Sequence, residues 1–214
     1  GETLINFRNG EIDILVGTQM VSKGLDFSRV TLVGVISAET SLWMPDFRAD
    51  ERTFQLLTQV AGRSGRSKDI GEVLIQTQNK KHFVLQRVLM NDYEGFYKKE
   101  ILDRERMNYP PFSRLCVIEM KDKDEEKVKT AITHLYKLLY RYKNHFSVSE
   151  PTTAVIARLR GEYRFQILIK VLKSSDPSGI ILRKALDNCI GEYNSSSKHR
   201  DVRIFVDIDP QNIA

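Results

Sequence analysis

Short apolar runs predict three strands in the first half of the chain. The runs are IDILVGT (12–18), VTLVGVISA (30–38) and GEVLIQT (71–77). The first two are rich in Val and Ile, which is typical of strands buried on both faces of a parallel sheet. We therefore expect residues 12–77 to form part of an α/β layer structure.

Helical spacing of apolar residues follows the second run. Residues 49–64 place Phe54, Leu57 and Val60 on one face, and Asp50 is a suitable helix cap. Residues 82–107 have the pattern of two further helices, with a break near Asn91-Asp92.

The motif NYPPF (108–112) separates two regions of different pattern. A tandem proline cannot continue a helix, because proline lacks a backbone N–H and its ring restricts the preceding residue. We place a domain boundary here, which divides the chain into residues 1–108 and 109–214.

The second region predicts the element order strand, helix, hairpin, helix, strand. The first strand is SRLCVIEMKD, and the amphipathic helix that follows covers 124–143. A hairpin over 153–172 turns near Arg160-Gly161, and DPSGIILRKALDNCIGEYN and VRIFVDID give the last helix and strand. The order βαββαβ suits a small ferredoxin-like α+β sandwich.

Charge differs between the two halves more than the net value of +5 suggests. Residues 1–105 contain 14 Lys and Arg against 15 Asp and Glu, whereas residues 106–214 contain 19 against 13. The basic second half favours a polyanionic partner. A well-solvated surface explains the same balance, so charge alone does not decide between the two.

Composition excludes several classes of protein. The chain is 41% hydrophobic, which is enough for a real core, and no apolar run has the length of a membrane span. The N-terminus shows no secretory signal and no initiator Met. The two cysteines form no CxxC pair, which argues against a paired-thiol zinc site and fits a reducing cytoplasm.

The motif QVAGRSGR (59–66) carries the clearest chemistry. Helical spacing places Gln59, Arg63 and Arg66 on one side, and glycines leave room for a close ligand. Two guanidinium groups suit a phosphate, which arginine binds through paired hydrogen bonds. A second interpretation is structural: arginines near a helix C-terminus interact favourably with the helix dipole.

This motif and the upstream GTQMVSKGLDF (17–27) resemble motifs VI and V of superfamily 2 helicases. With YPPF, ARLRGEYRFQILIK and the terminal VDIDP, nearly the whole chain resembles the family of bacterial primosomal replication-restart DNA helicases. The resemblance implies part of the second RecA-like helicase lobe followed by a C-terminal domain. It also implies 3′→5′ DNA unwinding driven by ATP, in the cytoplasm.

The resemblance assigns roles to individual residues. Arg63 and Arg66 would act as arginine fingers on the γ-phosphate, and Gln59 would position the nucleotide or water. Nucleotide-side positions would be Gly24, Asp26, Gly62 and Gly65, and DNA-side positions would be Gly17, Thr18 and Lys23. The alternatives without a functional role are that Asp26 caps a turn and that Lys23 is a solvated charge in a loop.

Some helicase motifs are absent from this sequence. It contains no G-x-x-x-x-G-K-[ST] and no D-E-x-H, and DEEK (124–127) lies on a predicted exposed helix. The family's zinc-binding segment is also absent. We therefore expect the end of a longer protein, in which ATP and Mg²⁺ are bound mainly by another lobe. This chain alone should hydrolyse no ATP and hold no metal.

The C-terminal hairpin is a candidate partner site. Arg158, Arg160, Tyr163 and Arg164 interleave positive charge with an aromatic ring, which fits DNA backbone contact with some base stacking. Binding of the acidic tail of single-stranded-DNA-binding protein and a merely polar hairpin tip are the alternatives. By resemblance, the partners are single-stranded and forked DNA, that protein, and primosome or helicase-loading proteins, with no membrane.

Two other functions stay open at this point. The first half could belong to another superfamily 2 translocase that acts on RNA, although YPPF and the tail argue against it. The chain could also be a non-catalytic module that docks on branched DNA or on proteins.

Overall fold

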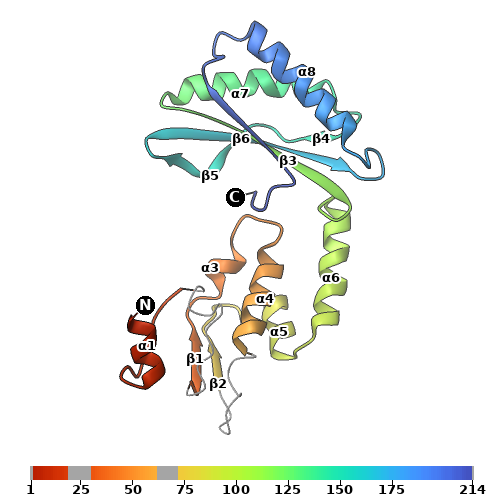
Figure 1. Ribbon diagram of the computed structural model, residues 1–214. Coiled ribbons are helices and arrows are strands. Elements are labelled where there is room, and N and C mark those ends of the chain that lie inside the picture. The colour runs from red at the N-terminus through yellow and green to blue at the C-terminus, as the bar shows by residue number, and fades with distance from the viewer. Residues whose placement is uncertain (1, 19–29, 62–71, 214) are drawn as a thin grey trace. The chain divides into compact units, whose positions relative to one another are not determined.

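The computed structural model describes residues 2–18, 30–61 and 72–213 (Figure 1). Two compact units divide the chain. One comprises Gly1–Met44 and Arg48–Lys99, and the other comprises Pro45–Phe47 and Glu100–Ala214. Each unit has its own sheet and its own buried core.

The first unit contains a two-stranded parallel sheet. β1 (Leu32–Val35) pairs with β2 (Glu72–Ile75) from Leu32 opposite Glu72 to Val35 opposite Ile75. The helices that begin in this unit are α1 (Glu2–Asn9), α3 (Glu39–Leu42), α4 (Ala49–Ala61), α5 (Phe83–Leu89) and α6 (Tyr93–Arg106). The strands predicted within 30–38 and 71–77 are therefore confirmed, and so is the helix that begins at residue 49.

The predicted strand over 12–18 is wrong. These residues have no regular secondary structure, and Ile14 and Val16 are 79% and 83% exposed. A doubly buried strand needs neighbouring strands to satisfy its backbone groups. In the described part of the chain, β1 and β2 pair only with each other, so this apolar run has no partner.

Helices α4, α5 and α6 form a small core in the first unit. Phe54 of α4 stacks on Phe96 of α6 with ring centroids 4.3 Å apart, and Val84 of α5 is buried beside them. The break predicted near Asn91-Asp92 is confirmed. Asn91 has a positive φ of 50°, and the Asp92 carboxylate accepts a 2.8 Å hydrogen bond from the Gly95 N–H.

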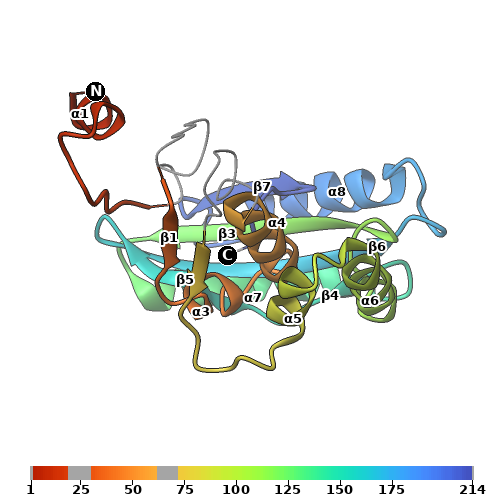
Figure 2. The same cartoon turned by 90° about the horizontal axis from the view of Figure 1, so that it is seen from below.

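The second unit is an antiparallel sheet with two helices on one face (Figure 1). The strand order is β4-β6-β3-β7, and β5 also pairs with β6. Figure 2 shows this sheet from below, with the helices behind it. The elements are β3 (Ser113–Asp122), α7 (Glu125–Tyr140), β4 (Ser147–Val148), β5 (Thr152–Leu159), β6 (Glu162–Leu172), α8 (Ile180–Ser196) and β7 (Arg203–Ile208).

This arrangement confirms the predicted element order and adds the two-residue strand β4. Alternation places the core on the helix side: Cys116, Ile118 and Met120 of β3 are fully buried. They lie opposite Ile169, Ile167 and Phe165 of β6, which are also buried. The helices cover them with an apolar face that includes Val128, Ile132, Leu135, Leu139, Leu182, Leu186 and Tyr193.

The NYPPF motif lies after the end of α6, as the tandem proline predicts. Tyr109 stacks on Phe47 at 4.7 Å and 9°, and Lys170 Nζ lies 3.5 Å from the Tyr109 ring centroid. The guanidinium of Arg104 lies 5.1 Å from the centroid of Phe47. This alternation of cations and rings fixes Pro45–Phe47 to the second unit, although that segment lies between α3 and α4 in the sequence.

Candidate nucleic-acid interface

The residues predicted from the helicase-like motifs are only partly placed. Gln59 is exposed in the last turn of α4, and Gly17 and Thr18 are exposed in a segment without regular structure. Arg63, Arg66, Gly62, Gly65, Lys23, Gly24 and Asp26 lie outside the described residues. The nucleotide-facing constellation therefore stays a prediction.

The β5–β6 hairpin has a tight turn where the sequence predicts one. Arg160 and Gly161 both have positive φ, 52° and 84°, as a two-residue type I′ hairpin turn requires. No atom would lie within 4 Å of a Cβ on Gly161, so a side chain there would not clash. Glycine suits this position because of its positive φ.

The hairpin brings together some of its predicted residues. Arg158 pairs across the strands with Tyr163, and its guanidinium lies 4.9 Å from the Tyr163 ring centroid. Arg160 is exposed in the turn. A cation stacked on an aromatic ring beside a second arginine is a surface that can meet both a phosphate and a base.

Arg164 lies on the opposite face of the sheet from this pair. It is directly across from Lys121, whereas Tyr163 is across from Asp122. Its Nη2 lies 2.6 Å from Glu119 Oε2, and its Nη1 donates to the Ile156 carbonyl at 3.3 Å. The hydrogen bond to Glu119 raises the pKa of Arg164. This arginine is therefore engaged within the sheet.

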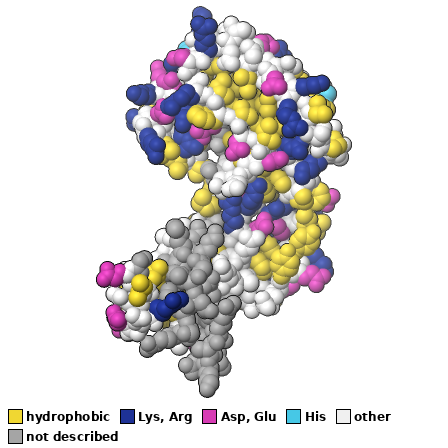
Figure 3. Space-filling view, in the orientation of Figure 1, with side chains coloured by type: hydrophobic (Ala, Val, Ile, Leu, Met, Phe, Trp, Pro, Cys, Tyr) yellow, Lys and Arg dark blue, Asp and Glu magenta, His cyan; other side chains and the backbone are white. Residues whose placement is uncertain are grey.

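The helix-free face carries cationic and aromatic groups that the sequence reasoning missed. Lys121 Nζ lies 4.4 Å from the ring centroid of Phe205, which is 46% exposed. Arg203, two residues earlier on β7, pairs with Glu162. Period-two alternation in VRIFVDID (202–209) is a signal that could have revealed this face. Figure 3 shows Lys and Arg side chains on the second unit, interspersed with Asp and Glu.

The buried thiols do not supply a reactive centre. Cys116 and Cys189 are both fully buried, and burial raises the pKa of Cys116 to about 12. A thiol in this state is a poor nucleophile, because the thiolate is the reactive form. The described residues contain no group of three or more His, Cys, Asp or Glu placed to hold a metal ion. None of their helices is both long and apolar enough to cross a membrane.

Two known family models match the chain, one in its first half and one in its second half. Residues 1–68 match the model described as "Helicase conserved C-terminal domain". Residues 105–211 match the model described as "Primosomal protein N C-terminal domain". The chain is thus a helicase C-terminal lobe with a short parallel sheet, followed by an antiparallel α+β domain.

Curated relatives agree over nearly the whole chain. It is 40% identical over 208 residues to "Replication restart protein PriA" of Bacillus subtilis (strain 168), which covers 95% of this chain. Proteins of the same name from Treponema pallidum (strain Nichols) and Haemophilus influenzae (strain ATCC 51907 / DSM 11121 / KW20 / Rd) are 38% and 33% identical, each over 99% of it. The chain belongs to the PriA replication restart protein family.

The match covers only part of each relative. The chain spans 25% of the Bacillus subtilis protein, 31% of the Treponema pallidum protein and 28% of the Haemophilus influenzae protein. It corresponds to the C-terminal portion of the family.

Proposed function

We propose that this chain is the C-terminal portion of an ATP-dependent 3′→5′ DNA helicase that restarts replication at stalled or branched forks. The observation that carries the proposal is the combination of a complete Q-x-x-G-R-x-G-R motif (59–66) with the two family matches in sequence order. Family membership favours DNA over RNA as the substrate. The primosome, helicase-loading proteins and single-stranded-DNA-binding protein are the proposed protein partners.

The first unit would supply the second, RecA-like half of an ATP site. Gln59 is exposed in the last turn of α4, and Arg63 and Arg66 follow this helix in the sequence. An exposed amide at this helix end is compatible with a nucleotide approaching it. ATP hydrolysis supplies the free energy, and in this proposal the arginines stabilise charge developing on the γ-phosphate. Gly62 and Gly65 would leave space for that phosphate, with Gly24 and Asp26 nearby.

The residues that couple the nucleotide to DNA would lie in the other motif. Gly17 and Thr18 would hold the DNA backbone through N–H and hydroxyl donors, and Lys23 would add a phosphate contact. The second unit, with its ferredoxin-like strand order, would contact DNA through Arg158, Arg160 and Tyr163. Arg164 would have to leave Glu119 before it could join them.

The proposal is tested by comparing the purified chain with the full-length protein. We expect the chain to bind DNA but to hydrolyse no ATP, with or without DNA, because no P-loop occurs in its sequence. The full-length protein should show DNA-stimulated hydrolysis under the same conditions. DNA-stimulated ATP hydrolysis by the purified chain, free of contaminating enzyme, would contradict the proposal that another lobe is needed for hydrolysis.

A further inference from the structure

A groove of about 500 Å³ lies in the second unit between α7 and the loop that follows α8. Three lysines, two histidines and four serine or threonine residues line it. No carboxylate and no large apolar side chain is among the lining residues. The groove therefore presents hydrogen-bond donors and positive charge, and none of its lining residues was among the site residues predicted from the sequence.

One wall is a stripe along α7. Lys129, Thr133 and Lys137 are spaced four residues apart, so they lie on the same side of the helix. At 1.5 Å per residue, Lys129 and Lys137 are separated by about 12 Å along the axis. That length suits an extended anion with several charges better than a single small ion.

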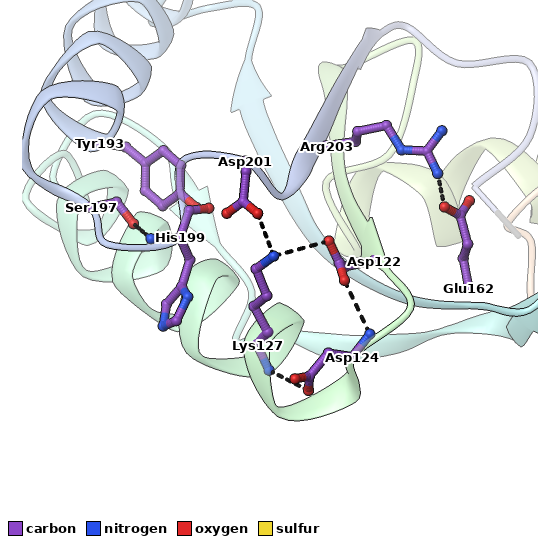
Figure 4. A network of polar contacts seen from close by, with 9 residues as sticks. All are labelled: Asp122, Asp124, Lys127, Glu162, Tyr193, Ser197, His199, Asp201 and Arg203. Atoms are coloured by element: carbon purple, nitrogen blue, oxygen red, sulfur yellow. Dashed lines mark hydrogen bonds and ion pairs between the residues drawn. The ribbon is translucent and has the colours of Figure 1, made fainter.

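The opposite wall is a loop held in place from within (Figure 4). Tyr193 is fully buried, and its hydroxyl donates a 2.7 Å hydrogen bond to the His199 carbonyl. The Ser197 hydroxyl oxygen accepts a 3.0 Å hydrogen bond from the His199 N–H. Because these bonds fix the backbone beside Lys198, the wall is formed before any ligand binds.

The nearby acidic groups are already engaged. Asp201 Oδ2 lies 2.5 Å from Lys127 Nζ, which also contacts Asp122 on β3 (Figure 4). Lys129 contacts Glu125 at 3.0 Å and Glu126 at 2.8 Å. Within the described parts of the chain, Lys137 and Lys198 have no carboxylate partner. These two lysines supply the uncompensated charge of the groove.

The composition of the groove favours phosphates over an acidic peptide. Peptide and protein interfaces are anchored by buried aromatic or aliphatic side chains, and the lining offers none. Lysine and hydroxyl groups are ordinary phosphate ligands. The start of α7 lies at the hairpin end of the sheet, because Asp122, just before α7, pairs with Tyr163 and Lys121 pairs with Arg203. The groove runs from this part of α7 toward the other end of the helix.

We propose that this groove binds the phosphates of a single DNA strand, with Lys137 and Lys198 as the principal cationic contacts. Thr130 and Thr133 add exposed hydroxyl donors along the α7 wall. The inference rests on the proposed DNA function of the second unit and extends it from the hairpin to the surface beside α7. A strand that leaves Arg158 and Arg160 at the hairpin would continue along α7.

The test measures binding of a single-stranded oligothymidylate as a function of salt. For the chain with Lys137→Gln and Lys198→Gln, loss of two phosphate contacts should reduce the slope of log affinity against log salt by about 1.4. The affinity advantage of the parent chain should therefore shrink by about sevenfold between about 50 and 200 mM salt. Lys173→Gln with Lys184→Gln is the matched control, since both side chains are exposed and outside the groove.

Equal losses in the groove and control variants would overturn the proposal, because they would show a response to net charge alone. An unchanged slope in the groove variant would overturn it as well. An Asp-rich peptide of equal charge serves as the second probe. If the two lysines govern binding of that peptide but not of the oligonucleotide, the groove is a protein site.

A hairpin variant, Arg158→Ala with Arg160→Ala, separates this inference from the proposed function. Loss in the groove variant alone supports the groove and removes the hairpin from the DNA path. Loss in the hairpin variant alone supports the proposed hairpin contact and overturns the groove. Additive losses support both contacts.

Discussion

In the first unit, Leu32 of β1 is 53% exposed and Leu74 of β2 is 59% exposed. In the second unit, the central strand β3 buries every core-facing residue from Cys116 to Met120. A two-stranded sheet is rarely stable without covering layers. The second unit has five strands and two helices that close its core. The second unit thus contains the contacts that its fold requires, and the first has apolar strand surface left uncovered among the described residues.

The same difference separates two kinds of function. The motifs that resemble nucleotide-binding chemistry belong to the first unit, and they require a partner lobe to act. The candidate contacts of the second unit lie on a complete scaffold. Catalysis should therefore depend on the full-length protein, and binding should persist in this chain.

The largest expected effect is on catalysis by the full-length protein. Arg66→Ala or Arg63→Ala should reduce DNA-stimulated ATP hydrolysis by about 10³–10⁵, because an arginine finger acts on the transition state. DNA binding should change little. Lysine should rescue poorly, since a point charge cannot reproduce the planar guanidinium.

ATPase rate, DNA affinity and thermal stability should be measured on the same preparations. Arg8→Ala is a suitable control, because Arg8 is an exposed arginine on α1. A folded Arg66→Ala protein with near-parental turnover would remove this arginine from catalysis and favour a helix-dipole role. Gly65→Val should also reduce turnover by filling the space that a phosphate needs.

The next effect concerns stability and asks whether the two units unfold separately. Leu135→Ala removes a fully buried side chain from the core of the second unit and should cost about 2–5 kcal/mol. Leu74→Ala, at a mostly exposed position of β2, should cost less than about 1 kcal/mol.

Urea unfolding followed by two probes distinguishes the units. Trp43 is the single tryptophan of the chain and belongs to the first unit, so its fluorescence reports that unit. Circular dichroism reports both. Leu135→Ala should move the circular dichroism transition and leave the fluorescence midpoint in place. A common shift of both probes would mean that the units unfold as one.

The fold of the second unit was predicted from the sequence better than the fold of the first, for the same reason. In the second unit, alternation and helical spacing predicted each long element and the Arg160-Gly161 turn, because each element buries one face against the others. In the first unit, IDILVGT (12–18) has the composition of a buried strand but no pairing partner in the described sheet. Local composition cannot report a missing neighbour.

The candidate interface was predicted less well than the fold. Arg158, Tyr163 and Arg164 are close in the sequence, but strand alternation places Arg164 on the other face, against Glu119. The groove beside α7 depends on residues about 60 positions apart in the chain, and only tertiary structure brings Lys137 and Lys198 together. The hydrogen bond from the Tyr193 hydroxyl to the His199 carbonyl likewise cannot be predicted from the spacing of residues in the sequence.

A smaller effect tests the hairpin. Arg158→Ala with Arg160→Ala should reduce the salt slope of single-strand binding by about 1.4, since two phosphate contacts are lost. Arg164→Ala should leave that slope unchanged and instead lower thermal stability, because Glu119 loses its partner. If Arg164→Ala flattens the slope as much as the pair does, the ion pair with Glu119 opens on binding.

The smallest effect concerns the start of α8 and its dependence on pH. Asp176 is buried, and its carboxylate accepts a 3.0 Å hydrogen bond from the Leu182 N–H. Burial acts to raise the pKa of Asp176, but hydrogen bonds from backbone N–H groups of the first turn outweigh it, so its pKa is held below 3.8. Asp176→Asn keeps an oxygen acceptor but loses the negative charge at the start of α8. It should therefore destabilise the second unit at neutral pH by about 1 kcal/mol, as loss of a charge that interacts with a helix N-terminus typically does.

The sign of the pH dependence follows from the lowered pKa. A carboxylate with a folded-state pKa below its unfolded value stabilises the fold fully above the unfolded value. That stabilisation is lost as pH falls through the folded-state value. The difference in unfolding free energy between the parent chain and Asp176→Asn should thus be constant near neutral pH and shrink below about pH 4. Exposed Asp187 on α8 gives the control, since Asp187→Asn should change stability little at either pH. A difference that grows on acidification would show that the Asp176 carboxyl is bound in its protonated form.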